Sequence, residues 1–254
     1  MIGKKEKRLM KLINPINKRT LFVAFDHAVE HGPTDYEGIN LDPVRIAKIA
    51  SEGKADGLIV HSGAARYIRR FSNIKVPLVI KITGRTKLSP KIMQSIVTTV
   101  EEAELIGACG VAATVYVGSE FEGEMLERLA EIKRECIRRG MPLIGFMYPR
   151  VKGKKKDDLQ IVRYSARLGA ELGVDIVKTY YTGSKESFSK VVRDANFVPV
   201  VAAGGEEKFE LDFLEMVKDI IDSGAAGLAV GRNVWKKNNG LFILKQIRRI
   251  VHGD

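Results

Sequence analysis

The sequence predicts a single (β/α)8 barrel, and three observations indicate this fold class. Eight short apolar runs recur along the 254 residues, and amphipathic stretches lie between most of them. The runs are almost continuously apolar, which is typical of parallel strands buried on both faces. The chain also has the length that one such barrel requires. An open, doubly wound sheet is the alternative fold, but no G-x-G-x-x-G motif follows an early run.

The predicted elements follow in chain order, beginning with a basic helical extension over residues 1–18. Helical periodicity is clear at residues 98–107, 122–140, 159–173 and 211–224. No linker or break in composition marks a second domain, so residues 1–254 are predicted to form one. The eight predicted strands are residues 20–25, 57–61, 77–82, 110–115, 142–147, 174–179, 198–203 and 227–230.

Glycines are expected to end several of the helices just before the next strand. A glycine can adopt the left-handed conformation that commonly follows the last turn of a helix. The glycines predicted to do so are Gly53, Gly107, Gly140, Gly173 and Gly224.

The net charge of +11 indicates an attraction for anions, either nucleic acid or small phosphorylated molecules. The basic residues occur in short clusters that are separated by acidic helical faces. Basic and aromatic residues do not alternate in the way that stacks bases, so no nucleic-acid partner is predicted. A basic barrel that binds RNA and has lost catalysis is the non-enzyme alternative.

The chain shows no signal for a membrane span, secretion or a metal site. It contains no run of eighteen apolar residues, and its N-terminus lacks the apolar core of a signal peptide, so the cytoplasm is expected. Four scattered histidines give no ligand spacing, and we predict neither a metal nor a cofactor. Cys109 and Cys136 are expected to pack rather than to form a disulfide.

Lys178 ends an apolar run and is the most informative residue of the chain. Side chains two apart in a strand share a face, so a strand that buries Ile176 also directs Lys178 inward. The C-terminal ends of barrel strands are where barrel enzymes place their catalytic groups, and a lysine there suits an amine nucleophile. The alternative is a strand-end lysine whose ammonium reaches solvent.

An amine nucleophile must be neutral, and an ordinary lysine is not. At a pKa of about 10.4, only about one amine in 2,500 is neutral at pH 7. Burial and neighbouring cations lower the pKa, and Lys81 and Arg150 are the candidate cations. Tyr148 and Asp26 also follow strands and suit proton transfer. Their alternatives are a tyrosine packed on the rim and a carboxylate that orders a loop or caps a helix.

Glycine-rich loops follow the last two predicted strands. Gly204, Gly205 and Gly231 expose backbone N–H groups that can bind phosphate, and Arg232 can add a charged fork. The alternative is that these glycines only form tight turns.

The chain resembles the archaeal-type class I fructose-1,6-bisphosphate aldolases, within the deoxyribose-phosphate aldolase-like superfamily. The resemblance spans residues 25 to 235 in the order of the family. The matching segments are Phe25-Asp26-His27, Glu30-His31-Gly32-Pro33, Thr114-Val115-Tyr116 with Gly118-Ser119, Tyr148-Pro149-Arg150, residues 177–183, Gly204-Gly205 and residues 231–235.

This resemblance implies a metal-independent aldolase that forms a Schiff base, acts on a phosphorylated sugar and assembles as a homo-oligomer. It implies Lys178 as the Schiff-base lysine, Tyr148 as the general acid/base and Asp26 as an active-site carboxylate. Phosphate contacts are implied for Gly204, Gly205, Gly231 and Arg232. At the neighbouring strand ends, Arg150, Lys81 and His27 complete the set of predicted substrate contacts.

Three departures from the family pattern bear on the substrate. Ala28 and Val151 stand where the family usually has glycine, and Glu206-Glu207-Lys208 replaces a Pro/Ala-Lys-Thr segment. Two acids beside a phosphate loop weaken phosphate binding unless they point outward. A sister group, the 2-amino-3,7-dideoxy-D-threo-hept-6-ulosonate synthases, shares the fold and the lysine and is the alternative function.

Overall fold

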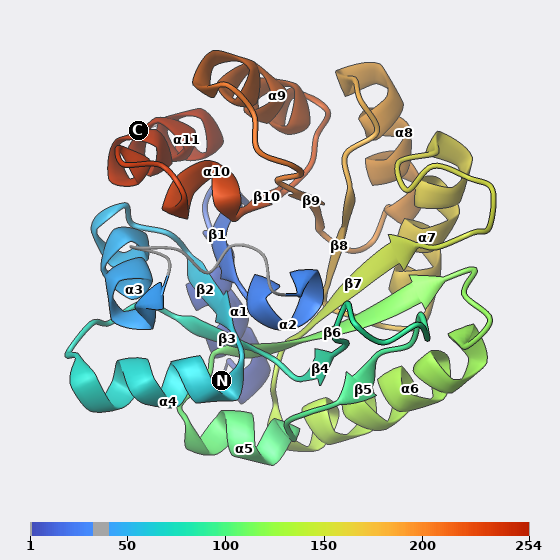
Figure 1. The fold of residues 1–254 in the computed structure, drawn as a ribbon, viewed down its shortest axis with the longest axis horizontal. Helices are drawn as coiled ribbons and strands as arrows, with labels where there is room; N and C mark the ends of the chain where they lie inside the picture. Colours follow the sequence, from blue (N-terminus) through green and yellow to red (C-terminus); the bar gives the residue numbers. More distant parts are fainter. Residues whose placement is uncertain (1, 33–40, 254) are drawn as a thin grey trace.

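The structure, a computed structural model, describes residues 2–32 and 41–253, which form a closed barrel of eight parallel strands (Figure 1). The strands follow one another round the barrel in chain order, and the last one pairs with the first. The predicted fold class is confirmed, and each barrel strand overlaps its predicted run. These strands are β1 (Thr20–Phe25), β2 (Gly57–Val60), β3 (Leu78–Lys81), β6 (Gly110–Val117), β7 (Leu143–Pro149), β8 (Ile176–Tyr180), β9 (Val200–Ala203) and β10 (Gly227–Val230).

Helices form a ring around the strands, with α2 near its centre in Figure 1. The four helices predicted at residues 98–107, 122–140, 159–173 and 211–224 correspond to α5 (Val100–Leu105), α6 (Glu122–Arg139), α7 (Leu159–Glu171) and α9 (Glu210–Asp222). A two-stranded antiparallel ribbon of β4 (Thr83–Gly84) and β5 (Ser95–Ile96) was not predicted, because two-residue strands carry no periodic signal. The helices are α1 (Lys4–Leu12), α2 (His27–His31), α3 (Pro43–Glu52), α4 (Ser62–Phe71), α5 (Val100–Leu105), α6 (Glu122–Arg139), α7 (Leu159–Glu171), α8 (Lys185–Ala195), α9 (Glu210–Asp222), α10 (Arg232–Trp235) and α11 (Gly240–His252).

Alternation along the strands divides the apolar residues into two cores. One core lies between the strands and the surrounding helices. The other contains side chains from strands all round the sheet, so it fills the inside of the barrel. The buried members of this inner core are Leu12, Phe22, Ile59, Val79, Ala112, Ile144, Phe146, Ile176, Val201 and Ala229.

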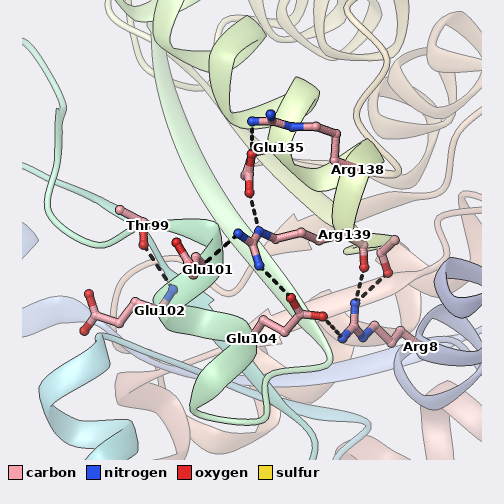
Figure 2. A network of polar contacts seen from close by, with 9 residues as sticks. Arg8, Thr99, Glu101, Glu102, Glu104, Glu135, Arg138 and Arg139 are labelled. Atoms are coloured by element: carbon pink, nitrogen blue, oxygen red, sulfur yellow. Dashed lines mark hydrogen bonds and ion pairs between the residues drawn. The ribbon is translucent and has the colours of Figure 1, made fainter.

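Helix α1 closes the N-terminal end of the barrel. Leu12 is buried in the inner core, and a Cβ atom at Gly57 or Gly110 would lie 3.3 or 2.9 Å from its methyl groups. These glycines begin β2 and β6 and leave room for the leucine. Arg8 holds the helix in place by donating to the carbonyls of Arg139 and Gly140, both at 2.8 Å, and to Glu104 at 2.9 Å (Figure 2).

All five predicted glycines lie at or directly after the end of a helix, and four of them have the expected left-handed conformation. Gly107, Gly140, Gly173 and Gly224 have φ between +58° and +88°. Gly53 instead has φ −79°, and Lys54 takes the left-handed conformation with φ +53°. Gly53 is glycine because of packing, since a Cβ atom there would lie 2.4 Å from Cδ2 of Leu244.

Some of the predicted features lie outside the described residues, namely Pro33 of the segment that begins at Glu30 and the end positions 1 and 254 of the predicted domain. Within the described residues, no helix is long and apolar enough to cross a membrane.

Candidate active site

The C-terminal ends of the barrel strands carry polar side chains in positions that continue the inner core. Ile176, Val79 and Ile59 belong to that core, and two residues further along their strands lie Lys178, Lys81 and His61. Because alternate residues share a face, these three side chains face the inside of the barrel at its mouth. The mouth is therefore lined with ionisable groups directly above an apolar floor.

Lys178 is buried, with only 5% of its surface exposed. This excludes the alternative in which its ammonium reaches bulk solvent. Its Nζ atom lies 4.0 Å from the centre of the Phe146 ring on the paired strand β7. Burial lowers the pKa of Lys178 to about 8, with a further lowering from Lys81, while the carboxylates of Asp26 and Glu30 act in the opposite direction. The fraction of neutral amine at neutral pH is therefore far larger than for an ordinary lysine.

Asp26 follows β1 and is the residue before α2, but its side chain makes no capping hydrogen bond. This excludes the alternative of a helix-capping carboxylate. Burial alone would raise the pKa of Asp26, but the positive charges of Lys178 and Lys81 outweigh it and hold the pKa below its ordinary value. Asp26 is therefore ionised at neutral pH and places a negative charge near the amine.

Tyr148 lies two residues after Phe146 on β7, so both rings face the barrel mouth. It stacks on Tyr180 of the neighbouring strand, with ring centres 4.5 Å apart and planes 15° apart. Burial, followed by the nearby groups of Tyr180, Asp26 and Glu30, raises the pKa of Tyr148 well above its ordinary value. The phenol keeps its proton across the neutral range and can act first as a proton donor.

Arg150 extends the same aromatic cluster toward the rim. It donates to the Tyr180 hydroxyl at 2.8 Å, and its guanidinium lies 4.8 Å from the centre of the Tyr116 ring. These contacts fix a cation beside Tyr148, where the arginine was predicted to contact substrate.

The glycine-rich loops after β9 and β10 meet. Asn233 joins them by donating to the carbonyls of Gly204 at 3.1 Å and Glu206 at 2.9 Å. Gly204 packs so closely on β10 that a Cβ atom would lie 3.0 Å from the Ala229 carbonyl oxygen. Gly205 has φ +71°, and the Arg232 guanidinium lies 3.5 Å from its carbonyl. The α10 helix after Gly231 is only four residues long, so its dipole is small, and the groups of these loops that can attract an anion are the backbone N–H groups and Arg232.

Comparison with known proteins decides the family. The pattern of the DeoC/LacD family aldolases matches residues 20–237. The chain belongs to this aldolase family. A fructose-bisphosphate aldolase class 1 from Thermoproteus tenax is 38% identical over 241 residues, which are 92% of this chain and 90% of the relative. A 2-amino-3,7-dideoxy-D-threo-hept-6-ulosonate synthase 1 from Archaeoglobus fulgidus is 36% identical over 257 residues, covering 100% of this chain and 93% of the relative.

Solved structures agree with this assignment. An archaeal fructose 1,6-bisphosphate aldolase superposes with a TM-score of 0.92 at 35% identity, covering 99% of this chain and 100% of the other. A structure of such an aldolase, in which the catalytic lysine is covalently bound to the carbinolamine intermediate, gives a TM-score of 0.91 at 35% identity, with 98% and 99% covered.

Two of the predicted substrate contacts have other partners in this aldolase. The ammonium of Lys81 is fully buried and lies 2.7 Å from the Thr83 carbonyl and 3.0 Å from Glu30. His27 is also buried and stacks on Trp235, with ring centres 4.2 Å apart. Both side chains thus have partners within the protein.

The departures from the family pattern are accommodated without blocking the loops. Glu206 forms an ion pair with Lys156 at 2.6 Å, and Glu207 forms one with Lys237 at 2.7 Å. Glu206 is 74% exposed, so its charge is largely solvated. Val151 packs against Gly118. A Cβ atom added at Gly118 would lie 2.4 Å from Cγ2 of Val151. Ala28 is exposed.

Sequence reasoning missed five polar residues at this site: Glu30, His61, Gln94, Tyr116 and Asn233. Three of them belong to segments that were quoted as motifs, but no role was assigned to them. His61 lies two residues after the inward-facing Ile59, just as Lys178 lies two residues after Ile176. This spacing was the one sequence signal for His61. Its Nε2 atom is buried and makes no hydrogen bond with the described residues, and burial and the positive charge of Lys81 lower the pKa of its imidazole. Gln94 lies outside the barrel strands and carried no signal.

Within the described residues, no group of three or more His, Cys, Asp or Glu side chains could hold a metal ion.

Proposed function

We propose that this aldolase reversibly cleaves fructose 1,6-bisphosphate to dihydroxyacetone phosphate and glyceraldehyde 3-phosphate through a Schiff base on Lys178. The observation that carries the proposal is the buried Lys178, whose pKa is lowered to about 8 and which shares the barrel mouth with an ionised Asp26 and a protonated Tyr148. An amine nucleophile, an acid and a counter-charge are the groups that imine chemistry needs.

The reaction begins with addition of neutral Nζ to the C2 carbonyl of the open-chain sugar. Tyr148 donates its proton to the carbinolamine oxygen, which leaves as water and produces the iminium cation. The carboxylate of Asp26 stabilises this cation, because opposite charges attract strongly in a buried site. The phenolate of Tyr148 then accepts the proton of the C4 hydroxyl.

Loss of that proton breaks the C3–C4 bond and releases glyceraldehyde 3-phosphate. The bonding electrons flow into the iminium and form an enamine on Lys178. Protonation at C3 by Tyr148 restores the iminium, and water then adds at C2 and gives a proton to the Tyr148 phenolate. Collapse of the carbinolamine releases dihydroxyacetone phosphate and the free amine, so atoms and protons balance over the cycle.

The phosphate contacts are also part of the proposal. The N–H groups of the loops at Gly204, Gly205 and Gly231, together with Arg232, bind one phosphate. Arg150 is the candidate for the other end of the sugar, since its guanidinium is held by Tyr180, which stacks on Tyr148. The net charge of +11 favours approach of a substrate that carries two phosphates.

The test is reductive trapping with borohydride. Incubation with dihydroxyacetone phosphate in the presence of a chelator should add the mass of the reduced triose at Lys178, and a coupled assay should detect fructose 1,6-bisphosphate cleavage. Lys178→Met should show neither result. An intact protein that is not modified at Lys178 would contradict the proposal.

The second candidate function is the 2-amino-3,7-dideoxy-D-threo-hept-6-ulosonate synthase reaction, which uses the same lysine as a transaldolase. It is supported by the 36% identity over 257 residues to the relative from Archaeoglobus fulgidus. Trapping with a deoxyketose phosphate, together with no cleavage of fructose 1,6-bisphosphate, would favour it.

We also propose a cytoplasmic homo-oligomer that acts in glycolysis and gluconeogenesis. Support for assembly comes from large apolar side chains at the surface, such as Phe209, which is 85% exposed, and Leu105, which is 83% exposed. Light scattering of the purified protein should give a mass that is a multiple of 28.2 kDa, and a monomer would contradict the assembly.

A further inference from the structure

Glu30 lies inside the barrel mouth, where donors from three other parts of the chain converge on its carboxylate. Lys81 Nζ and Gln94 Nε2 both lie 3.0 Å from Oε1, and the Tyr116 hydroxyl donates to Oε2 at 2.9 Å. Gln94 also donates to the Tyr116 hydroxyl at 2.8 Å. A carboxylate with this many partners is held in one place, because moving it would leave several buried groups unpaired.

The carboxylate anchors a helix that has little stability of its own. Helix α2 has only five residues and no side-chain N-cap, and so short a helix is not stable in isolation. Asp26 immediately precedes α2, one turn before Glu30, and residues four apart lie on the same face of a helix. The contacts of Glu30 with Lys81 on β3 and Tyr116 on β6 therefore also set the position of Asp26.

A second branch of contacts leads from Glu30 to Tyr148. The ring of Tyr116, whose hydroxyl bonds Glu30, lies under the guanidinium of Arg150 at 4.8 Å. Arg150 in turn donates to Tyr180, and Tyr180 stacks on Tyr148. One carboxylate thus supports the elements that carry both proton-handling groups of the proposed reaction.

Glu30 also determines where the charge of Lys81 is placed. Two lysines and two carboxylates share this mouth, namely Lys81, Lys178, Asp26 and Glu30. Lys81 forms its ion pair with Glu30, which leaves Asp26 available to the amine and the substrate. Without the Glu30 charge, Lys81 would still interact electrostatically with the carboxylate of Asp26.

We propose that Glu30 is a positioning residue for the aldolase reaction: it docks α2 so that Asp26 faces Lys178, retains Lys81, and through Tyr116 supports the stack that orients Tyr148. The inference rests on the proposed function but adds a residue that contacts none of the reacting atoms.

The decisive variant is Glu30→Gln, which keeps the shape of the side chain and removes its charge. With fructose 1,6-bisphosphate as substrate we expect kcat to fall by about 100-fold, since small misplacements of catalytic groups have effects of this size. KM should change less than kcat, because the loops at Gly204, Gly205 and Gly231 are untouched and Arg150 is also held by its hydrogen bond to Tyr180.

A pH profile separates positioning from a general loss of structure. The charged groups that act on Lys178 are Asp26 after β1, Lys81 on β3 and Glu30 on α2. Glu30 raises the pKa of Lys178, so removing its charge should lower that pKa. The measurement is the rate at which borohydride traps the imine of Lys178 with dihydroxyacetone phosphate, plotted against pH. The rising, acidic part of this curve (its acid limb) should move down by about 0.5 to 1 pH unit.

Glu104→Gln is the matched control, since Glu104 bonds Arg8 and Arg139 at the opposite end of the barrel. It should leave kcat and the acid limb unchanged. The inference is overturned if Glu30→Gln retains the wild-type kcat. It is also overturned if kcat falls while the acid limb of the trapping profile stays at the wild-type pH.

If Glu30→Gln does not fold, Tyr116→Phe carries the test, because it removes the hydrogen bonds of the hydroxyl to Glu30 and Gln94 without changing any charge. A kcat within about twofold of the wild type would then overturn the inference. Failure of the wild type to be trapped at all would instead contradict the proposed function, so the two outcomes are distinguishable.

Discussion

The Nζ atom of Lys178 lies 4.0 Å from the centre of the Phe146 ring, and the Nζ atom of Lys81 lies 5.5 Å from the same centre. The ring offers the Lys178 amine an aromatic face and no acceptor, and within residues 2–32 and 41–253 no hydrogen bond to this amine is formed. An aromatic face stabilises a cation only modestly compared with water. The ring therefore serves as an apolar floor that keeps the amine dry, while Lys81 supplies a fixed positive charge.

This arrangement predicts the pH dependence of imine formation. Because the pKa of Lys178 is lowered to about 8 from 10.5, the rate of trapping by dihydroxyacetone phosphate should rise with pH up to about pH 8 and then level off. Stopped trapping reactions analysed by mass spectrometry provide the measurement. A rate that keeps rising tenfold per pH unit up to pH 10 would show that the amine is not perturbed.

Burial of the amine should also reduce stability. The pKa of Lys178 is lower in the folded chain than in the unfolded one, so the charged form is penalised at pH 7, and the penalty disappears as the pH rises from about 8 to 10.5. Lys178→Met should raise the free energy of unfolding at pH 7 by up to about 3 kcal/mol. Urea unfolding at pH 7 and pH 10 should show this gain shrinking, whereas Lys190→Met, at an exposed lysine of α8, should show no such trend.

Tyr148→Phe should separate imine formation from proton transfer. Removing the hydroxyl should lower kcat for cleavage by about 100- to 1,000-fold, since this is the usual contribution of a general acid or base. KM should change little. Tyr164→Phe, at a 60% exposed tyrosine of α7, is the control. Cleavage by Tyr148→Phe at the wild-type rate would remove this tyrosine from the mechanism.

The glycines of the β9 loop predict a defect in substrate binding. In Gly204→Ala the new methyl group would lie 3.0 Å from the Ala229 carbonyl oxygen, so the loop must shift away from β10. We expect KM for fructose 1,6-bisphosphate to rise by at least about tenfold, as for loss of one charged hydrogen bond. Gly123→Ala in α6 is the control, because nothing lies within 4 Å of its Cβ position. An unchanged KM in Gly204→Ala would place the phosphate elsewhere.

The network at the N-terminal end of the barrel predicts a contribution to stability without one to activity. Glu104 accepts from Arg8 at 2.9 Å and from Arg139 at 3.0 Å, and hydrogen bonds from both arginines lower its pKa (Figure 2). Glu104→Gln should lower the free energy of unfolding by about 1 kcal/mol at pH 7. A lowered carboxyl pKa contributes stability above the unfolded value, so the difference should vanish as acid protonates Glu104. Glu127→Gln, at an exposed glutamate of α6, should have no effect in the same urea titrations.

The sequence by itself determined the barrel and the direction of its inward side chains. Near-continuous apolar runs indicate strands buried on both faces, and a period of two then directs Lys178 inward because it directs Ile176 inward. The same local rule applies to His61 and Lys81. Glycines at helix ends were predictable wherever backbone conformation required them, as at Gly140, but Gly53 depends on a contact with Leu244 that lies 191 positions away.

Only the tertiary structure decided which groups the inward residues contact. Periodicity specifies the face on which a side chain lies, but the partner of a buried charge depends on how separate elements close around it. Lys81 carried the signal of a substrate contact, yet the fold brings Glu30 from α2 and Gln94 from an irregular segment to its ammonium. A buried charge must be paired, and closure of the barrel determined that its partner is Glu30 and not Asp26.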